Sequence, residues 1–470
     1  MDWLSIIPPI VAIIIVFWKK EVISALLFAL VCSEILLLVS DPQQSMWLAP
    51  IMMLDRIVDV AGSEGNTRIL LFSVLVGALL ALIRDSGGVT ATVQRIMDLG
   101  IAKTRQQVGG LTMFTGVIVF VESNLSVLSA GILSRGLFDK FKMSRARLAY
   151  IIDSTSAPIC ILILLNGWGA FVLGLISQYS LDESAVSILW GSVWFNFYAL
   201  FTLVIVAYTI ITDKVHGPMQ VEEGLALTNS PEATIPDEPI ITSNDTQPIK
   251  SKSRFMLLPL ITLVVSMLGF MLLTGNGDLT QGSGSRSVLY ATTLATLLAY
   301  ILVVTHRRFT HREALNISFK GMGELLPLVT IVLLSISLGA SLKVLGTGLF
   351  VAGIVGEYLP VALVVPMLFL AGGIMSFTTG TSWGTFAILI PIGIPLVQTL
   401  GLPPSLVVAA ILSGGIFGDH CSPISDTTAV SSIAAGCDIL THVKTQLPYA
   451  LVAGGISVIA FTLASFVTMA

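Results

Sequence analysis

Long uninterrupted stretches of apolar residues recur from one end of this chain to the other, and they limit the folds that it can adopt. A helix of about 20 apolar residues crosses the roughly 30 Å hydrocarbon core of a bilayer. Charged residues make up only 11% of the 470 residues, whereas hydrophobic residues make up 54%. Soluble domains carry about 25% charged residues, so this chain cannot surround itself with a water-facing surface. The sequence therefore predicts an integral membrane protein.

The apolar stretches are continuous rather than alternating, which favours helices over the strands of a membrane barrel. Several are too long for one helix or contain Gly, Pro and Ser, so we expect about eleven to thirteen spanning elements, together with hairpins that enter the membrane and return. No small-residue cleavage site follows the first stretch, so we interpret it as a membrane helix and not a signal peptide. The stretches run over residues 3–18, 22–39, 69–83, 108–134, 148–178, 185–212, 255–274, 287–305, 324–356, 360–400, 404–440 and 447–469.

The rest of the composition narrows the possible partners. The net charge is −4, and neither basic tracts nor interleaved aromatic residues indicate nucleic acid. The four cysteines show no CxxC or Cys/His spacing, so disulfides and zinc are not expected, and we expect no cofactor. The partner that the sequence predicts is the lipid bilayer, and an oligomer is compatible with it.

One stretch has the composition of a linker between two membrane halves. It contains five prolines, scattered acids and hydroxyls, and few aromatic residues, which is typical of disordered segments. We therefore expect a first transmembrane half over residues 1–211, a flexible cytoplasmic linker over 212–253 and a second transmembrane half over 254–470. The basic clusters at 135–147 and 307–312 are expected on the cytoplasmic side.

The two halves share an order of features. In the first, FVESNLSVLSAGIL (120–133) precedes YIIDSTSAPIC (150–160), and in the second, SFTTGTSWGTFAILIP (376–391) precedes IFGDHCSPISDTT (416–428). The connecting loop of the first half holds five Lys and Arg residues, and that of the second half holds none. Opposite loop charge indicates opposite orientation in the membrane, as in the inverted-topology repeats of secondary transporters. The predicted fold is therefore an all-α polytopic membrane protein of two inverted repeats, each with a re-entrant hairpin and a discontinuous helix.

Carboxylates and hydroxyls inside these apolar stretches are the candidate site. A charged side chain at the bilayer centre costs about 2.5–3.5 kcal/mol or more, so Asp153, Asp419 and Asp426 are expected to serve function. Proline breaks a helix and frees backbone carbonyls that must find partners. Sodium is a hard cation that prefers oxygen ligands, and we expect Na⁺ at these three aspartates. Glu122 and His420 are candidate proton carriers, because a buried carboxylate and an imidazole can both exchange protons.

The stretch GIFGDHCSPISDTTAVSS (415–432), followed by AAGCDILTHVKTQLPYAL and supported by TTGTSWGT (378–385), resembles the NhaC family of sodium/proton antiporters in the ion transporter superfamily. This chain has His420 and Cys421 where many plain antiporters have Lys-Met. That variant resembles a branch whose relatives include sodium-coupled carriers of amino acids and other organic solutes.

The resemblance implies a central site between two inverted repeats, and it implies the following binding residues for ion or substrate. In the second half these are Ser382, Asp419, Ser422, Ser425, Asp426 and Thr427. In the first half they are Asn124, Asp153, Ser154 and Thr155.

The leading hypothesis is a multi-pass sodium/proton antiporter of the plasma (cell inner) membrane that transports Na⁺ and H⁺ without a cofactor. The alternative is sodium-coupled transport of an amino acid or other small organic solute. A channel is compatible with composition. An intramembrane aspartyl protease would also use two aspartates, but its Gly-x-Gly-Asp pattern is absent because Ile416 occupies the first glycine position. The chain is therefore not expected to be an enzyme.

Overall fold

The computed structural model describes residues 3–39, 45–98, 103–120, 122–164, 166–179, 181–228 and 251–469. All regular secondary structure in these ranges is helical, as predicted. Ten helices of the described chain are long and apolar enough to cross a membrane, or eleven with one bent pair, so the protein is a multi-pass membrane protein. The count lies at or below the expected range because the first stretch forms a helix of only 13 residues and residues 108–134 are divided between two helices, neither of which is a candidate span.

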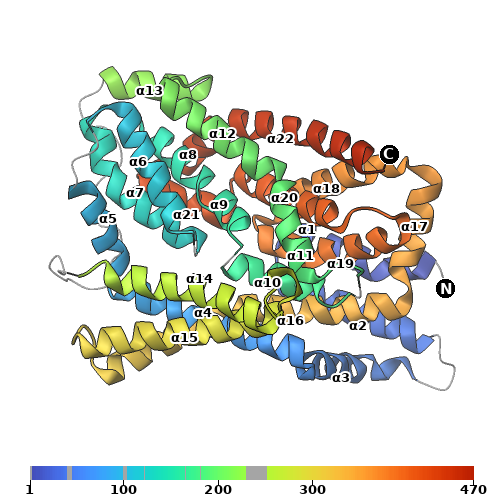
Figure 1. The fold of residues 1–470 in the computed structure, drawn as a ribbon. Helices are drawn as coiled ribbons and strands as arrows, with labels where there is room; N and C mark the ends of the chain where they lie inside the picture. The colour runs from blue at the N-terminus through green and yellow to red at the C-terminus, as the bar shows by residue number, and fades with distance from the viewer. Residues whose placement is uncertain are drawn as a thin grey trace.

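Long helices form one layer, which lies along the lower part of Figure 1. At its centre α4 (Glu64–Asp85) of the first half crosses α16 (His311–Leu345) of the second half. Gly77 and Gly321 meet at this crossing, and a Cβ added at Gly77 would lie 2.3 Å from the carbonyl oxygen of Gly321. Only glycine lets the two backbones approach so closely. The other members of the layer are α2 (Val22–Val39), α3 (Ala49–Gly62), α14 (Arg254–Thr274) and α15 (Gly284–Thr305).

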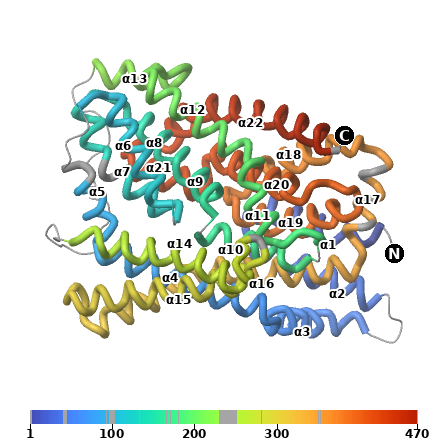
Figure 2. Tube along the Cα trace, viewed as in Figure 1, coloured from blue at the N-terminus to red at the C-terminus, as the bar shows by residue number. Residues whose placement is uncertain are grey.

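A second region contains the hairpins and the interrupted helices, and its path can be followed in Figure 2. The two halves repeat this motif with inverted topology, as the sequence predicts. In the first half the hairpin is α6 (Arg105–Ile118) with α7 (Ser123–Lys140), and the interrupted helix is α8 (Arg145–Ser154), α9 (Ala157–Leu162) and α10 (Gly167–Ile176). In the second half the hairpin is α18 (Val364–Thr379) with α19 (Ser382–Leu400), and the interrupted helix is α20 (Pro404–Cys421) with α21 (Asp426–Ala435).

The two repeats interlock. Helix α21 of the second half packs against α7 and α8 of the first, and α10 of the first half packs against α19 of the second. The latter contact includes Trp168 and Trp383, whose ring centroids lie 4.6 Å apart. The remaining helices are α1 (Ile7–Lys19), α5 (Gly88–Asp98), α11 (Ala185–Trp194), α12 (Phe197–Thr212), α13 (Pro218–Thr228), α17 (Thr347–Tyr358) and α22 (Ile439–Met469), with short 3₁₀ turns η1 (Trp3–Ile6), η2 (Met46–Leu48), η3 (Leu279–Gln281) and η4 (Val361–Leu363).

The stretch expected to be a flexible linker begins with an ordered helix, α13, and residues 229–250 lie outside the described residues. Glu223 of α13 is buried and forms ion pairs with Arg105 and with Arg147, the latter at 3.1 Å. Arg147 is fully buried and also pairs with Asp213 at 2.6 Å. These contacts fasten the beginning of α8 to the segment that follows α12.

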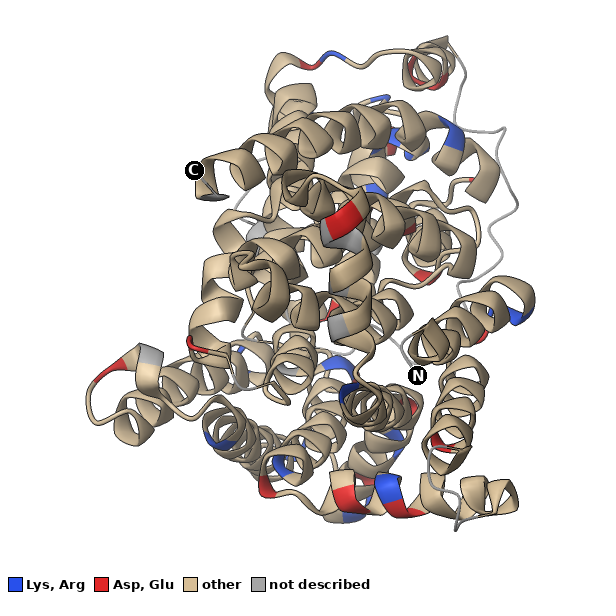
Figure 3. Cartoon of the chain, turned by 90° about the vertical axis from the view of Figure 1, so that its right-hand side faces the viewer, with Lys and Arg blue, Asp and Glu red and all other residues tan. Residues whose placement is uncertain are grey.

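Charged positions are sparse throughout the molecule, as Figure 3 shows. Two of the acidic residues, Asp153 and Asp419, have no exposed surface at all. Because a buried charge needs compensating partners, their surroundings locate the candidate site.

Candidate functional site

Two helix breaks lie beside the buried aspartates. The first break, residues 155–156 between α8 and α9, is followed by Pro158, and the second, residues 422–425 between α20 and α21, contains Pro423. Proline cannot donate the backbone hydrogen bond that a continuous helix requires. Each break therefore leaves polar backbone groups inside the protein, next to the side chains at the helix ends.

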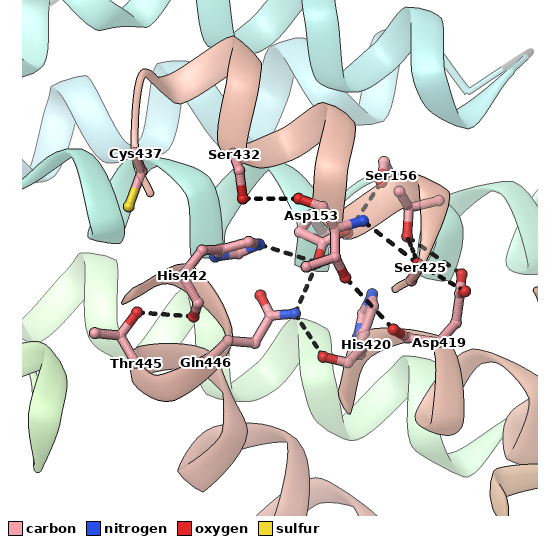
Figure 4. Close-up of polar contacts among 12 residues, drawn as sticks. Asp153, Ser156, Asp419, His420, Ser425, Ser432, Cys437, His442, Thr445 and Gln446 are labelled. Atoms are coloured by element: carbon pink, nitrogen blue, oxygen red, sulfur yellow. Dashed lines mark hydrogen bonds and ion pairs between the residues drawn. The ribbon is translucent and has the colours of Figure 1, made fainter. Parts of the chain in front are cut away.

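Asp419 in the last turn of α20 is surrounded by hydroxyl groups from its own chain segment. Ser425 Oγ donates a hydrogen bond to Asp419 Oδ1 at 2.8 Å, and Thr427 Oγ1 donates to Asp419 Oδ2 at 3.2 Å. The two hydroxyl oxygens lie 3.0 Å apart. Figure 4 shows Ser425 directed toward Asp419 from the far side of the break. The break therefore folds the chain back so that four side-chain oxygens converge.

This arrangement suits a small hard cation. A hydroxyl group that donates its proton to a carboxylate can rotate and present a lone pair to a bound ion instead. Carboxylate and hydroxyl oxygens are the ligands that such cations prefer. Sodium sites in transporters also form at the carbonyl ends of interrupted helices. Asp419, Ser425 and Thr427, called the Asp419 group below, supply a carboxylate, two hydroxyls and a position at the end of an interrupted helix.

Asp153 near the end of α8 has a different environment. Gln446 Nε2 donates to Asp153 Oδ2 at 2.7 Å, and His442 Nε2 lies 3.3 Å from the same oxygen. Gln446 Nε2 also donates to the backbone carbonyl of His420 at 3.0 Å. Both nitrogen atoms come from α22, and Figure 4 shows the Gln446 amide between Asp153 and His420. Nitrogen atoms of a distant helix therefore contact one oxygen of this carboxylate, and its other oxygen, Oδ1, is buried without a hydrogen-bond partner among the described residues.

His420 lies between the two groups and is buried. Its Nδ1 is 3.1 Å from the hydroxyl of Tyr198 on α12. Its Nε2 is buried and has no hydrogen-bond partner among the described residues. The imidazole is therefore held in place by one contact and keeps a second polar atom available.

The other predicted residues of the second half lie around the same break but have separate partners. Asp426 begins α21, and its carboxylate accepts a hydrogen bond from the backbone N–H of Thr427 at 2.9 Å. Unlike Asp419, Asp426 has an exposed side chain. Ser422 Oγ donates to the carbonyl of Phe377 at 2.7 Å, and so joins the break to the α18–α19 hairpin. Ser382 is buried at the start of α19.

The predicted residues of the first half lie at the hairpin and at the first break, and three of them have a polar atom without a partner. These atoms are Asn124 Oδ1, Asp153 Oδ1 and Ser154 Oγ, which are buried and lack hydrogen-bond partners among the described residues. Thr155 Oγ1 donates to the carbonyl of Ile151 one turn earlier, at 2.7 Å. Glu122 caps helix α7, because its carboxylate accepts hydrogen bonds from two backbone N–H groups at 3.0 and 2.6 Å.

The structure thus brings Asp419, Ser425 and Thr427 into direct contact and joins Asp153 to His420 through Gln446. Nowhere in the described ranges do three or more His, Cys, Asp or Glu side chains gather as a metal-ion group, so Asp153, Asp419 and Asp426 do not share one such group.

Sequence reasoning missed His442 and Gln446. Both are fully or almost fully buried, and they lie four residues apart in a helix that is otherwise mostly apolar. Residues at this spacing share one face of a helix. Polar side chains in a membrane helix generally face the protein interior. The spacing could therefore have predicted that both residues are buried, but it does not indicate that their partner is Asp153.

Comparison with known proteins relates this chain to ion transporters. A model of the Na⁺/H⁺ antiporter family matches residues 159–466. An uncharacterized protein of Haemophilus influenzae is 29% identical over 471 residues, which cover 95% of this chain and 88% of that protein. The malate-2H(+)/Na(+)-lactate antiporter of Bacillus subtilis is 38% identical over 143 residues, which are 29% of this chain and 30% of that protein.

The fold is also similar to that of a solved transporter. The crystal structure of the YdaH transporter from Alcanivorax borkumensis superimposes with a TM-score of 0.60 and covers 88% of this chain and 87% of that chain. The sequences are only 16% identical, so this likeness concerns the fold alone.

Proposed function

Because this chain belongs to the Na⁺/H⁺ antiporter family, whose model matches residues 159–466, we propose that it exchanges sodium for protons across the plasma membrane at the two helix breaks. The observation that carries the proposal is the contact of Asp419 with Ser425 and Thr427. A carboxylate in such a setting binds either a proton or a cation, and this competition is the simplest basis of antiport.

The transport cycle follows from that competition. With a proton on Asp419, the site is neutral and holds no sodium. When sodium enters, the proton leaves, the Ser425 and Thr427 hydroxyls turn their lone pairs to the ion, and the carboxylate balances its charge. Alternating access of the site to the two membrane faces, by movement of one part of the protein against the other, then couples the two gradients.

The wider site extends over both breaks. The hairpin tips and the carbonyl ends of α8 and α20 supply further oxygen atoms, and helix ends direct partial charges at an ion. The proposed binding residues are Asn124, Asp153, Ser154, Thr155, Ser382, Asp419, Ser422, Ser425, Asp426 and Thr427, with Glu122 and His420 as candidate proton carriers.

A second candidate is sodium-coupled transport of a small organic solute. One observation favours it: the malate-2H(+)/Na(+)-lactate antiporter of Bacillus subtilis matches 29% of this chain at 38% identity. Asn124 Oδ1 and Ser154 Oγ, which lack partners among the described residues, would serve as hydrogen-bonding groups for such a solute.

The test is flux through the purified protein in proteoliposomes under imposed sodium and pH gradients, with and without a panel of amino acids and organic acids. Antiport predicts that an inward sodium gradient moves protons outward without any added solute. Sodium uptake that requires one solute and leaves the internal pH unchanged decides for the second candidate.

The variant Asp419→Asn tests the site. The amide keeps the shape of the side chain but cannot carry the negative charge that balances sodium, so we expect sodium-driven flux to fall about 100-fold or more. The control is Glu64→Gln, which changes an exposed carboxylate paired with Arg68 in its own helix. Sodium coupling that survives in Asp419→Asn would overturn the assignment.

A further inference from the structure

Gln446 joins the two helix breaks with one side chain. Its Nε2 donates both of its hydrogen atoms, one to Asp153 Oδ2 at 2.7 Å and one to the carbonyl oxygen of His420 at 3.0 Å. Asp153 belongs to the first half of the chain and His420 to the second. The side chain is 1% exposed, so water does not replace these bonds. One amide therefore fixes the distance between a carboxylate of one repeat and the backbone of the other.

The two acceptors determine how the amide is oriented. In the reversed orientation, Gln446 Oε1 would face a carboxylate and a carbonyl, and both of these are acceptors that repel it. In the orientation of the structure, Oε1 is buried without a partner among the described residues. Both hydrogen bonds of the amide are therefore made by its nitrogen, to the Asp153 carboxylate and the His420 carbonyl. These two acceptors hold the amide in one orientation.

The carbonyl of His420 is an acceptor that helix α20 itself cannot satisfy. α20 ends at Cys421, and the last four carbonyls of a helix have no partner within it. Asp419, the proposed sodium carboxylate, directly precedes His420. A donor that holds the His420 carbonyl therefore also holds the last turn of α20 and the direction of the Asp419 side chain.

His442 reinforces the same contact from one turn earlier on α22. Its Nε2 lies 3.3 Å from the Asp153 oxygen that Gln446 contacts. Helix α22 thus presents two nitrogen groups to one carboxylate, and Gln446 alone extends the connection to α20.

From this geometry we infer that Gln446 is a positioning residue that holds the two helix breaks together and so sets the affinity for sodium. The inference rests on the proposed function and adds a residue to it. Gln446 contacts no ion itself. It keeps the last turn of α20 in the position in which Asp419, Ser425 and Thr427 converge.

The test is the dependence of flux on sodium concentration in proteoliposomes that contain Gln446→Leu. Leucine has a similar size and removes both donors, so we expect the KM for sodium to rise at least tenfold. The matched control is Thr445→Val, because Thr445 is the neighbouring residue, is 1% exposed, and within the described part of the chain donates only to carbonyls of its own helix. For that variant the KM is expected to stay within twofold of the unchanged protein.

A role in packing alone would lower the yield of folded protein and leave the KM unchanged. A KM within twofold of the unchanged protein in folded Gln446→Leu overturns the inference. If this variant does not fold, Gln446→Asn replaces it. Its amide is one methylene shorter and cannot reach both acceptors, so a KM raised at least threefold supports the inference and an unchanged KM overturns it.

The same measurements separate the two proposals. Absence of sodium-driven flux in the unchanged protein contradicts the proposed function. In that case the sodium concentration that protects the purified protein against heat is compared between the unchanged protein and Gln446→Leu. A tenfold higher concentration for the variant supports the positioning role, and equal concentrations or a lack of protection overturn it.

Discussion

Asp419 and Asp153 are equally buried, but their hydrogen-bond donors differ in kind and in origin. Asp419 is contacted by hydroxyls that lie six and eight residues along the chain. Asp153 is contacted by nitrogen groups of α22. A hydroxyl can turn from donor to acceptor when a cation arrives, whereas an amide N–H can only donate. The comparison indicates that the first environment can exchange its ligand and that the second holds a carboxylate in place.

The largest effect that would sharpen this comparison is expected from the hydroxyls of the Asp419 group. Ser425→Ala and Thr427→Ala each remove one oxygen atom that the sodium ion would contact. We expect the KM for sodium to rise about tenfold in each variant and up to about 100-fold in the double variant. The measurement is the sodium dependence of flux at fixed pH.

The control for these variants is Ser156→Ala at the first break, which changes a residue outside the proposed binding set. The Ser156 hydroxyl is buried and donates to the Asp153 carbonyl of its own chain segment, so its removal is expected to change the KM less than twofold. An equal rise for Ser156→Ala would show that the difference between the two breaks does not determine sodium binding.

A smaller effect on transport, but a clear one on stability, is expected at the other end of α8. Glu223→Gln leaves the fully buried Arg147 with Asp213 as its remaining ion-pair partner. Because an incompletely paired buried charge is costly, we expect the protein to lose about 2 kcal/mol of stability. The measurement is the temperature at which the protein unfolds in detergent.

The matched control is Glu222→Gln, which removes the same charge at the half-buried neighbouring position. If Glu222→Gln lowers the unfolding temperature as much as Glu223→Gln does, then the net charge of α13 matters and the ion pair does not.

The smallest effect is expected from an exposed ion pair in the layer of long helices, which contacts neither aspartate. Arg84 of α4 and Glu324 of α16 lie 2.8 Å apart, and their side chains are 40% and 42% exposed. Exposed ion pairs contribute only about 0.2–1 kcal/mol to the free energy of unfolding. Because this pair also contacts no residue of the proposed site, Glu324→Gln is expected to change the KM for sodium less than twofold. A larger change would mean that the layer of long helices controls the site.

Asp419 has partners close to it in the sequence and Asp153 has distant ones, and this difference explains what the sequence could predict. The helical class, the repeated hairpins and the Asp419 group were predictable, because Gly418–Thr428 contains the carboxylate, the hydroxyls and the proline break within one short stretch. Gln446 was not predictable as the partner of Asp153, because 293 residues separate the two. The ordered helix α13 was missed for a similar reason: the burial of Glu223 depends on Arg105 and Arg147. Composition describes a segment by itself and does not reveal such partners.

The long separation of Asp153 from Gln446 also has a consequence for biosynthesis. At about 5–20 residues per second, a ribosome needs on the order of 15–60 s to extend the chain by the 293 positions from Asp153 to Gln446. During that time the first half resides in the membrane with a carboxyl group whose amide donor does not yet exist. The first break can reach its final shape only after α22 has been inserted, so maturation of the N-terminal half waits for the last helix of the chain.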